Sequence, residues 1–310
     1  MNRSKEIRID SSVAPRKKSL SLPGAIIWVT CVHVAIGLAA GIAYLMSGEE
    51  RWIRIYFDYQ GSLFLVVVGG VEFFLTALAR RQFHSDEPLR KAWSLIMLAA
   101  AVRWTGLMLA NWLTVYSYIN PRVYLAPTWD VQAAASLREL GLLVNGPIHM
   151  LLLAAGLSLV LRLYKRLRIL VGLEAIDYLL LALVLAFTLS QGYQIFHVVS
   201  QSHDPVTLTA VLKWLTDPLL SCLLVEAVLI RRAVVNMGWG LISKSWGAYT
   251  AAIFLTSVAD MGMWADDYGY IRWQVGALTW YLWFIVAAAY ALAPAYQLQA
   301  SIRAKQELRT

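Results

Sequence analysis

The charged residues that could do chemistry in this chain are those that interrupt long apolar segments. Glu72 lies near the middle of the apolar segment 62–79, and Arg103 lies near the middle of the next one, 92–115. An ionisable side chain at this depth in a bilayer costs several kcal/mol unless it is paired. Because helices that follow each other are antiparallel neighbours, the sequence predicts a Glu72–Arg103 ion pair, either a structural latch or part of a proton or ion path. A guanidinium keeps its charge throughout the physiological range, which favours the latch.

A second group of polar residues lies toward the outer ends of three later segments. Lys213 and Asp217 are four residues apart and share one face of a helix, while Gln191 and Asp260 lie in the preceding and following segments. Pro218 cannot donate a hydrogen bond to the carbonyl four residues earlier, so that carbonyl becomes available to a ligand. The pattern predicts an outward-facing ligand or ion pocket, since carboxylate and carbonyl oxygens suit a cation. A Lys213–Asp217 pair that neutralises itself within one helix is the alternative interpretation.

The histidines were the residues to test for a cofactor, because intramembrane histidines can ligate haem iron. Only His149 and His197 share an expected depth, and neither has a partner histidine at a fixed helical spacing. The sequence also lacks a phosphate-binding loop, an H-E-x-x-H motif, a G-x-S-x-G motif and a cysteine pair. It therefore predicts no catalytic residues, no metal and no cofactor, disfavours haem, and favours a protein that is not an enzyme.

The composition indicates the environment that holds these residues. Hydrophobic residues make up 59% of the 310 residues and charged residues 15%, against roughly 45–50% and about 25% in soluble domains. The apolar residues form continuous runs of about twenty, the length that a helix needs to cross a bilayer, which indicates helices because the runs do not alternate. Eight transmembrane segments are predicted: 22–46, 62–79, 92–115, 147–163, 170–197, 206–230, 246–264 and 273–293. The fold class is an all-α polytopic membrane protein, which argues against a soluble enzyme.

The distribution of basic residues predicts the orientation. Most of the 27 Lys and Arg residues lie at the two termini and in every second loop between segments. Basic residues mark the cytoplasmic side of a membrane protein, so both termini are expected in the cytoplasm and the protein in the plasma (inner) membrane. The net charge of +8 is then a topology signal, and no nucleic-acid partner is predicted.

One aromatic pattern occurs twice and predicts an internal duplication. The pattern W-x-x-x-Y-x-Y-I recurs at an offset of 152 residues (264 − 112). Trp93 and the pair Arg80–Arg81 match Trp246 and the pair Arg231–Arg232 at nearly the same offset. A 4+4 tandem repeat with the two units parallel follows, since four segments return the chain to its starting side. The motif serves either as an interfacial anchor or as an outer ligand site, and its residues are Trp112, Tyr116, Tyr118, Trp264, Tyr268 and Tyr270.

The predicted organisation has four parts. Residues 1–21 form a basic cytoplasmic tail, and the first segment is a retained signal anchor. The first four-helix repeat covers 22–168 and carries an outer amphipathic insertion near 120–146, which is a plain connecting helix or a lid. The second repeat covers 169–297, and 298–310 form a cytoplasmic extension.

The remaining charges and one proline receive structural interpretations. Glu226 is expected to pair with Arg231 just over one turn later on the same helix, and Glu174 and Asp177 suit a helix N-terminus. Pro218 is expected to be the only proline well inside a helix, so a proline break would be confined to one half of the chain.

Two hypotheses for function follow. The first is a membrane module without its own catalytic domain that senses or assembles with partner subunits or lipids, with a protein partner or a homo-oligomer. The second is a carrier or channel for a small ion or solute. The first predicts a dry interior whose charges neutralise each other, and the second predicts a water-filled cavity that reaches Asp217 and Asp260.

Overall fold

The computed structural model describes residues 21–49, 51–54, 56, 60–111, 140–141, 143–170, 172–201, 208–238, 240–267 and 273–307. Every regular element within these ranges is helical. The eight long helices are α1 (Leu22–Ser47), α3 (Ser62–Arg80), α4 (Pro88–Ala110), α8 (His149–Arg166), α9 (Ala175–Gln201), α10 (Leu208–Met237), α11 (Leu241–Asp267) and α12 (Trp273–Glu307). Two short elements, α2 (Arg51–Arg54) and the π-helical turn η2 (Val144–Ile148), complete the described set.

The long apolar helices are consistent with a helical membrane protein. Within the described residues, six helices have the length and composition needed to cross a bilayer. They are α1, α3, α4, the continuous η2–α8 helix, the first twenty residues of α9, and α12 from Thr279. Helices α10 and α11 are as long as the others but carry more polar residues, among them Asp217, Glu226 and Asp260.

Prolines lie inside three of these elements, so the expectation that Pro218 is the only one was wrong. Pro294 lies inside α12, and Pro147 lies in η2, where a wider π-helical turn accommodates it. Helix α12 continues past Pro294 because its neighbour α11 packs along it closely, and Ser245 Oγ of α11 donates a hydrogen bond to the Ala293 carbonyl at 2.7 Å. Tertiary packing therefore outweighs the local cost of an internal proline.

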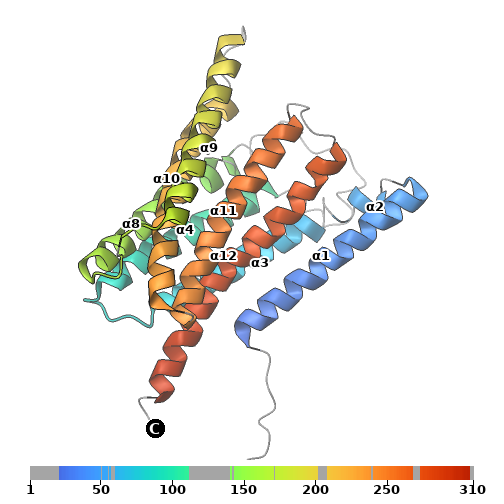
Figure 1. Cartoon of the computed structure of the whole chain (residues 1–310). Helices are drawn as coiled ribbons and strands as arrows, with labels where there is room; N and C mark the ends of the chain where they lie inside the picture. Colours follow the sequence, from blue (N-terminus) through green and yellow to red (C-terminus); the bar gives the residue numbers. More distant parts are fainter. Residues whose placement is uncertain are drawn as a thin grey trace, which may run out of the picture.

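Six of the long helices form a closed ring. In order around the ring they are α3, α4, α8, α10, α11 and α12, and α12 packs against α3 to close it. The other two long helices lie outside the ring: α1 packs against α12, and α9 packs against α10 (Figure 1).

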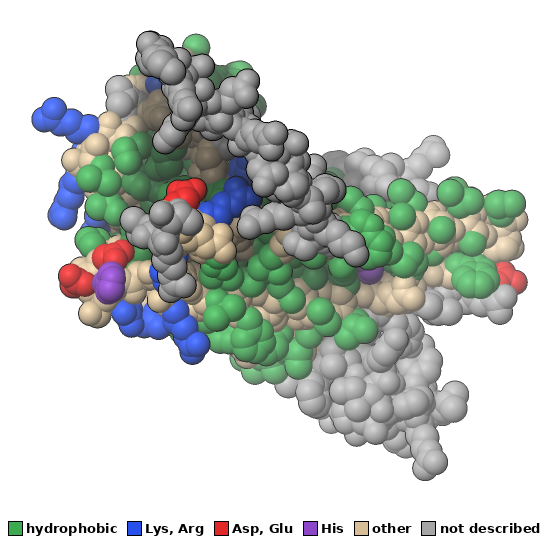
Figure 2. Space-filling view, turned by 90° about the horizontal axis from the view of Figure 1, so that it is seen from below, with side chains coloured by type: hydrophobic (Ala, Val, Ile, Leu, Met, Phe, Trp, Pro, Cys, Tyr) green, Lys and Arg blue, Asp and Glu red, His purple; other side chains and the backbone are tan. Residues whose placement is uncertain are grey.

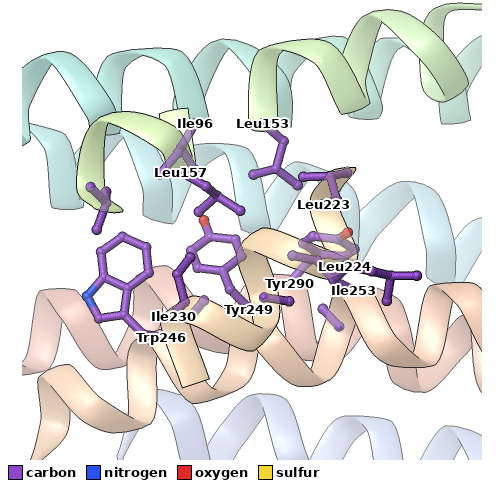
Figure 3. Packing of buried hydrophobic residues seen from close by; sticks show 14 of the residues in the cluster. Ile96, Leu153, Leu157, Leu223, Leu224, Ile230, Trp246, Tyr249, Ile253 and Tyr290 are labelled. Atoms are coloured by element: carbon purple, nitrogen blue, oxygen red, sulfur yellow. The ribbon is translucent and has the colours of Figure 1, made fainter. Parts of the chain in front are cut away.

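The interior of the ring is filled by large side chains. Trp93 of α4 and Trp246 of α11 are fully buried, and their ring centroids are 5.7 Å apart. Ile96, Leu157 and Ile253 belong with them to the largest buried cluster of the described residues, part of which Figure 3 shows from close by. The described helices thus enclose a packed core.

The start of α1 and the end of α12 lie side by side at one end of the bundle. Both helices line one groove there, and Lys305 Nζ near the end of α12 donates a hydrogen bond to Gln82 Oε1 of the α3–α4 turn at 2.8 Å. Viewed from this end, Lys and Arg side chains gather on the left of the molecule, while apolar side chains cover the part that extends to the right (Figure 2). The two ends of the described bundle therefore emerge on the same side.

Helix α1 packs against α12 and also makes one very close approach to Tyr56. A Cβ atom at Gly37 would lie 2.2 Å from the Tyr56 ring, so only glycine leaves room for this aromatic side chain. Tyr56 OH donates a hydrogen bond to the His33 carbonyl at 3.0 Å, and the His33 ring stacks on Phe64 with centroids 4.0 Å apart. The glycine at position 37 thus serves packing within the chain.

Candidate functional site

The predicted central charges meet between α3 and α4. Glu72 points from α3 and Arg103 from α4, and an Arg103 Nη1 donor contacts Glu72 Oε2 in an ion pair. Their side chains are 3% and 6% exposed, so the pair is enclosed by protein. The Arg103 guanidinium also lies over the Tyr290 ring of α12, 4.5 Å from its centroid, which is a cation–π contact. Neighbouring helices therefore neutralise and cover both charges.

Three further polar side chains surround this pair. His149, at the start of α8, meets the Tyr290 ring edge-on at 5.9 Å. Tyr249 of α11 lies 6.1 Å from Tyr290, and both tyrosines are buried. Thr76 Oγ1, one turn from Glu72, donates to the Glu72 backbone carbonyl at 2.7 Å. Helices α3, α4, α8, α11 and α12 thus contribute polar groups to one buried cluster, called the central cluster below.

The arginine of the central cluster is engaged by a carboxylate and by an aromatic face. Breaking the pair would leave a charge buried in the bundle, which costs far more than the intact pair contributes.

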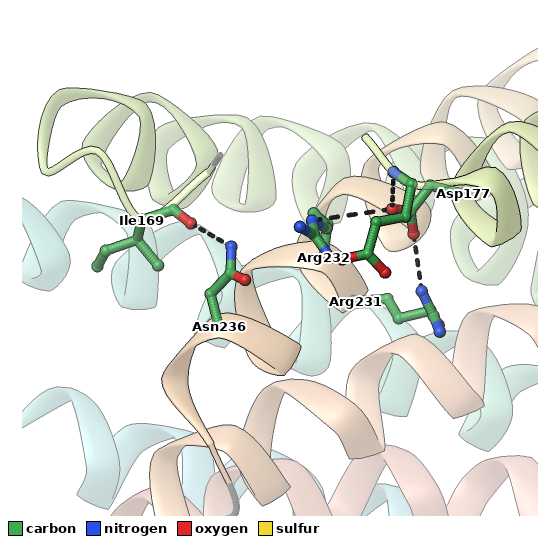
Figure 4. Close-up of polar contacts among 6 residues, drawn as sticks. Ile169, Asp177, Arg231, Arg232 and Asn236 are labelled. Atoms are coloured by element: carbon green, nitrogen blue, oxygen red, sulfur yellow. Dashed lines mark hydrogen bonds and ion pairs between the residues drawn. The ribbon is translucent and has the colours of Figure 1, made fainter. Parts of the chain in front are cut away.

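A second charged site joins α9 to α10 at the basic end of the bundle. Arg231 Nη1 contacts Asp177 Oδ1 at 2.7 Å, and Arg232 Nη1 contacts Glu174 Oε1 at 2.5 Å. Asp177 is fully buried and also accepts a hydrogen bond from the Glu174 backbone N–H at 2.9 Å. Asn236 Nδ2 donates to the Ile169 carbonyl nearby, so polar contacts from Ile169 and from the start of α9 both reach α10 (Figure 4).

This second site corrects the expected partner of Arg231. The sequence predicted a Glu226–Arg231 pair within one helix. In the structure Glu226 Oε1 instead accepts a hydrogen bond from Ser158 Oγ of α8 at 2.5 Å, while Arg231 reaches Asp177 of α9. Residues five apart on a helix point in different directions, so each side chain finds a partner on a different neighbouring helix.

The seam between α9 and α10 has a well-defined register. Thr188 Oγ1 of α9 donates a hydrogen bond to Ser221 Oγ of α10 at 3.0 Å. From this contact, Gln191 is three residues further along α9 and Asp217 is four residues back along the antiparallel α10, which brings the two to the same level. Both are buried, and the Gln191 amide has no hydrogen-bond partner among the described residues.

Asp260 lies at a comparable level on α11. Ser243 Oγ of α11 donates to the Val234 carbonyl of α10 at 3.4 Å. Asp217 precedes Val234 by 17 residues (234 − 217), and Asp260 follows Ser243 by 17 residues (260 − 243), so the two acids are equally far from that contact along antiparallel helices. Asp260 is half-buried. Lys213 belongs to α10, but its side chain is outside the described residues.

Much of the repeated aromatic motif lies outside the described residues. This holds for Trp112, Tyr116, Tyr118, Tyr268 and Tyr270, for most of the insertion near 120–146, and for the side chain of Trp264. The two histidines considered for haem have different surroundings: His149 belongs to the central cluster, whereas His197 stacks on the exposed Tyr193 of α9 at 6.0 Å.

Sequence reasoning did not assign Tyr249 and Tyr290 to the central cluster. Each lies three residues from one end of a predicted apolar segment, 246–264 or 273–293, where tyrosines of membrane proteins concentrate as interfacial anchors. Their positions in the sequence therefore gave no signal. Their partners could not be read from the sequence, because they depend on which helices adjoin in the ring.

We compared the chain with known protein families, proteins and structures. No protein-family model, curated protein or solved structure matches this chain.

Proposed function

We propose that this chain is an integral membrane module without a catalytic domain, which senses or assembles with partner subunits or lipids. The observation that carries the proposal is the packed interior of the ring. Trp93, Leu157 and Trp246 are at most 1% exposed, and the two central charges neutralise each other. A carrier or channel needs an open polar path through this region, and here tightly packed buried side chains fill it.

We further infer that the ring is a parallel duplication. The order of the helices around the ring supports this inference. Helices α3, α4 and α8 of the first predicted repeat are followed by α10, α11 and α12 of the second, in the same sequential order. The contact between Trp93 and Trp246, which match in the repeat, is the contact expected of equivalent residues beside a two-fold axis.

The orientation in the plasma membrane is also part of the proposal. The start of α1 and the end of α12 share the end of the bundle that carries the α3–α4 turn, with Arg81, Arg90 and Lys91. Basic loops face the cytoplasm, so we assign this end to the cytoplasmic side.

Helices α1 and α9 offer the surfaces for lipids or partner subunits. Each lies outside the ring and exposes large apolar side chains, such as Ile42 and Leu45 on α1 and Tyr193 and Phe196 on α9. Hydrocarbon chains or the apolar helices of a partner suit such faces.

The dry interior is tested by thiol accessibility in a bilayer. Cys31 and Cys222 are both exposed, so they are first replaced by serine. Thr76→Cys then places a thiol of similar volume in the central cluster, where Thr76 is fully buried. We expect no reaction with a small water-soluble thiol reagent, and rapid reaction would overturn the module proposal.

The matched control is Asp86→Cys in the exposed α3–α4 turn, which should react fully in the same membranes. A denatured sample of the Thr76→Cys protein should also react, which shows that the thiol is present. Protection that is lost only on unfolding supports a closed core.

A carrier or channel for a small ion or solute is the second candidate, and one observation favours it. The buried Gln191 amide without a partner lies level with Asp217 and Asp260, close to the carbonyl that Pro218 leaves without its usual donor. If this candidate holds, proteoliposomes should show a flux of a monovalent or divalent cation that Asp260→Asn abolishes. Equal flux in the wild type, the variant and empty liposomes would contradict the carrier or channel function.

A further inference from the structure

The groove between the start of α1 and the last part of α12 is the strongest unassigned feature of the described surface. It measures about 290 Å³, near the lower end of the roughly 300–1,000 Å³ that small-molecule pockets occupy. Ser21 and Leu22 form one wall, and residues of α12 from Ala295 to Gln306 form the other. Neither the central cluster nor the α9–α10 seam contributes to it.

The lining of this groove is divided by chemistry. Leu22, Leu298 and Ile302 are apolar lining residues, whereas Gln299 and Arg303 supply polar groups. Such a division fits a ligand that has both a hydrocarbon chain and a polar head. A purely polar solute would leave the leucine and isoleucine surfaces unmatched.

The charged residue that lines the groove, Arg303, is basic. Arg303 is exposed, and no acidic group among the described residues pairs with it. In the sequence, Arg16, Lys17 and Lys18 precede Ser21 by five residues or fewer. The nearest acid in sequence, Glu307, does not line it.

We propose that this groove binds one anionic glycerophospholipid of the cytoplasmic leaflet, with the phosphate at Arg303 and an acyl chain along the seam between α1 and α12. The assignment rests on the cytoplasmic orientation of this end in the proposed function and names the lipid class that the module engages. The basic residues before α1 strengthen the selection, since anionic leaflets attract such segments.

The position of α1 explains what a lipid does there. Helix α1 packs against α12 and, near its middle, against Tyr56, and most of its surface is exposed. A lipid in the groove between α1 and α12 would add contacts to α1 at the basic end of the bundle. Lipid occupancy therefore couples to the docking of this peripheral helix.

The test measures lipid retention by the full chain in a neutral detergent, using native mass spectrometry. Phosphatidylglycerol and phosphatidylcholine with identical acyl chains are added at equal concentration. We expect the wild type to retain phosphatidylglycerol with at least fivefold preference. Both lipids carry a phosphate, but only phosphatidylglycerol has a net negative charge, because the choline of phosphatidylcholine is cationic. A charge-assisted contact is worth about tenfold in affinity, so Arg303→Gln should lower retention of phosphatidylglycerol more than that of phosphatidylcholine and reduce the preference to twofold or less.

Arg166→Gln is the matched control, because Arg166 is an exposed basic residue at the end of α8 that does not line the groove. It should keep the wild-type preference. An equal loss in both variants would assign the effect to the general positive field and overturn the site, as would the absence of any preference in the wild type.

Two further experiments distinguish binding of a whole lipid from binding of a phosphate group alone. Leu298→Trp fills the groove without changing charge and should reduce retention of both lipids; Ile302→Trp at the exposed rim is the substitute if the first variant does not fold. Glycerol 3-phosphate should not compete with the lipid. Competition by this soluble anion would show a phosphate site and overturn the lipid assignment.

Failure of this inference can be told apart from failure of the proposed function. The lipid preference reports on the α1–α12 groove, whereas reaction of Thr76→Cys reports on the centre of the ring. If Thr76→Cys is protected and no lipid preference is found, only the lipid assignment of the groove is contradicted. If Thr76→Cys reacts rapidly, the module proposal is contradicted whatever the lipid result.

Discussion

The central ion pair and the charged site between α9 and α10 are built from the same residue types in different surroundings. Glu72 and Arg103 are enclosed by the ring and by the Tyr290 face. At the second site Arg231 is 32% exposed and Glu174 is 60% exposed, so water reaches part of each contact. The first site is surrounded by helices of both halves of the chain, and the second joins two consecutive helices.

This difference in exposure indicates which contacts hold the ring together and which attach a peripheral helix. A buried charge that loses its partner cannot rehydrate, whereas an interfacial arginine can turn toward water or lipid headgroups. The central pair should therefore govern stability of the whole bundle, and the α9–α10 contacts should govern the docking of α9.

Removing one partner of the central pair should have the largest effect. Glu72→Gln leaves the Arg103 charge buried without its carboxylate and should lower the free energy of unfolding by about 3–5 kcal/mol. Denaturation in mixed detergent micelles, followed by circular dichroism, measures the loss. The double variant Glu72→Gln/Arg103→Met should regain much of the stability. No recovery would show that the charge is not the cause.

Asp177→Asn should have the next largest effect. Asp177 is buried and receives contacts from Arg231 and from the Glu174 backbone, so we expect a loss of about 1–3 kcal/mol, as for a hydrogen bond to a charged group. The loss should appear as separation of α9, measured by limited proteolysis near residue 170. A loss as large as that of Glu72→Gln would erase the distinction between the two sites.

The Thr188–Ser221 hydrogen bond should contribute less. Ser221→Ala removes one neutral hydrogen bond between two helices, which is worth about 0.6 kcal/mol inside a membrane. The same denaturation measurement resolves it if several replicates are compared with the wild type. Ser190→Ala is a suitable control, because its hydroxyl bonds only to its own helix, at the Phe187 carbonyl.

Glu174→Gln should have the smallest effect, below about 0.5 kcal/mol, because its carboxylate is mostly exposed. That small contribution should vanish between about 0.05 M and about 0.5 M salt, since salt screens exposed charges. The effect of Glu72→Gln should be unchanged over the same range. A salt-sensitive central pair would mean that water reaches it.

Much of the helical framework could be predicted from sequence, because helix formation in a membrane depends on local runs of apolar residues. The expected segment 22–46 is the helix Leu22–Ser47, and 62–79 is Ser62–Arg80. The last predicted segment ended at residue 293, whereas α12 continues through Pro294 to Glu307. The depths of Glu72 and Arg103 followed from counting residues.

The sequence alone determined that the chain forms long apolar helices of the kind that cross membranes, which residues interrupt its apolar segments and on which helix each of them lies. These are local properties, set by hydropathy and by the rise of a helix. Only the tertiary structure decided the partners: Arg231 with Asp177 instead of Glu226, Tyr290 over Arg103, and large side chains in the centre of the ring. The physical reason is that the partner of a side chain depends on which helix faces adjoin. That arrangement depends on contacts between residues that are far apart in the chain.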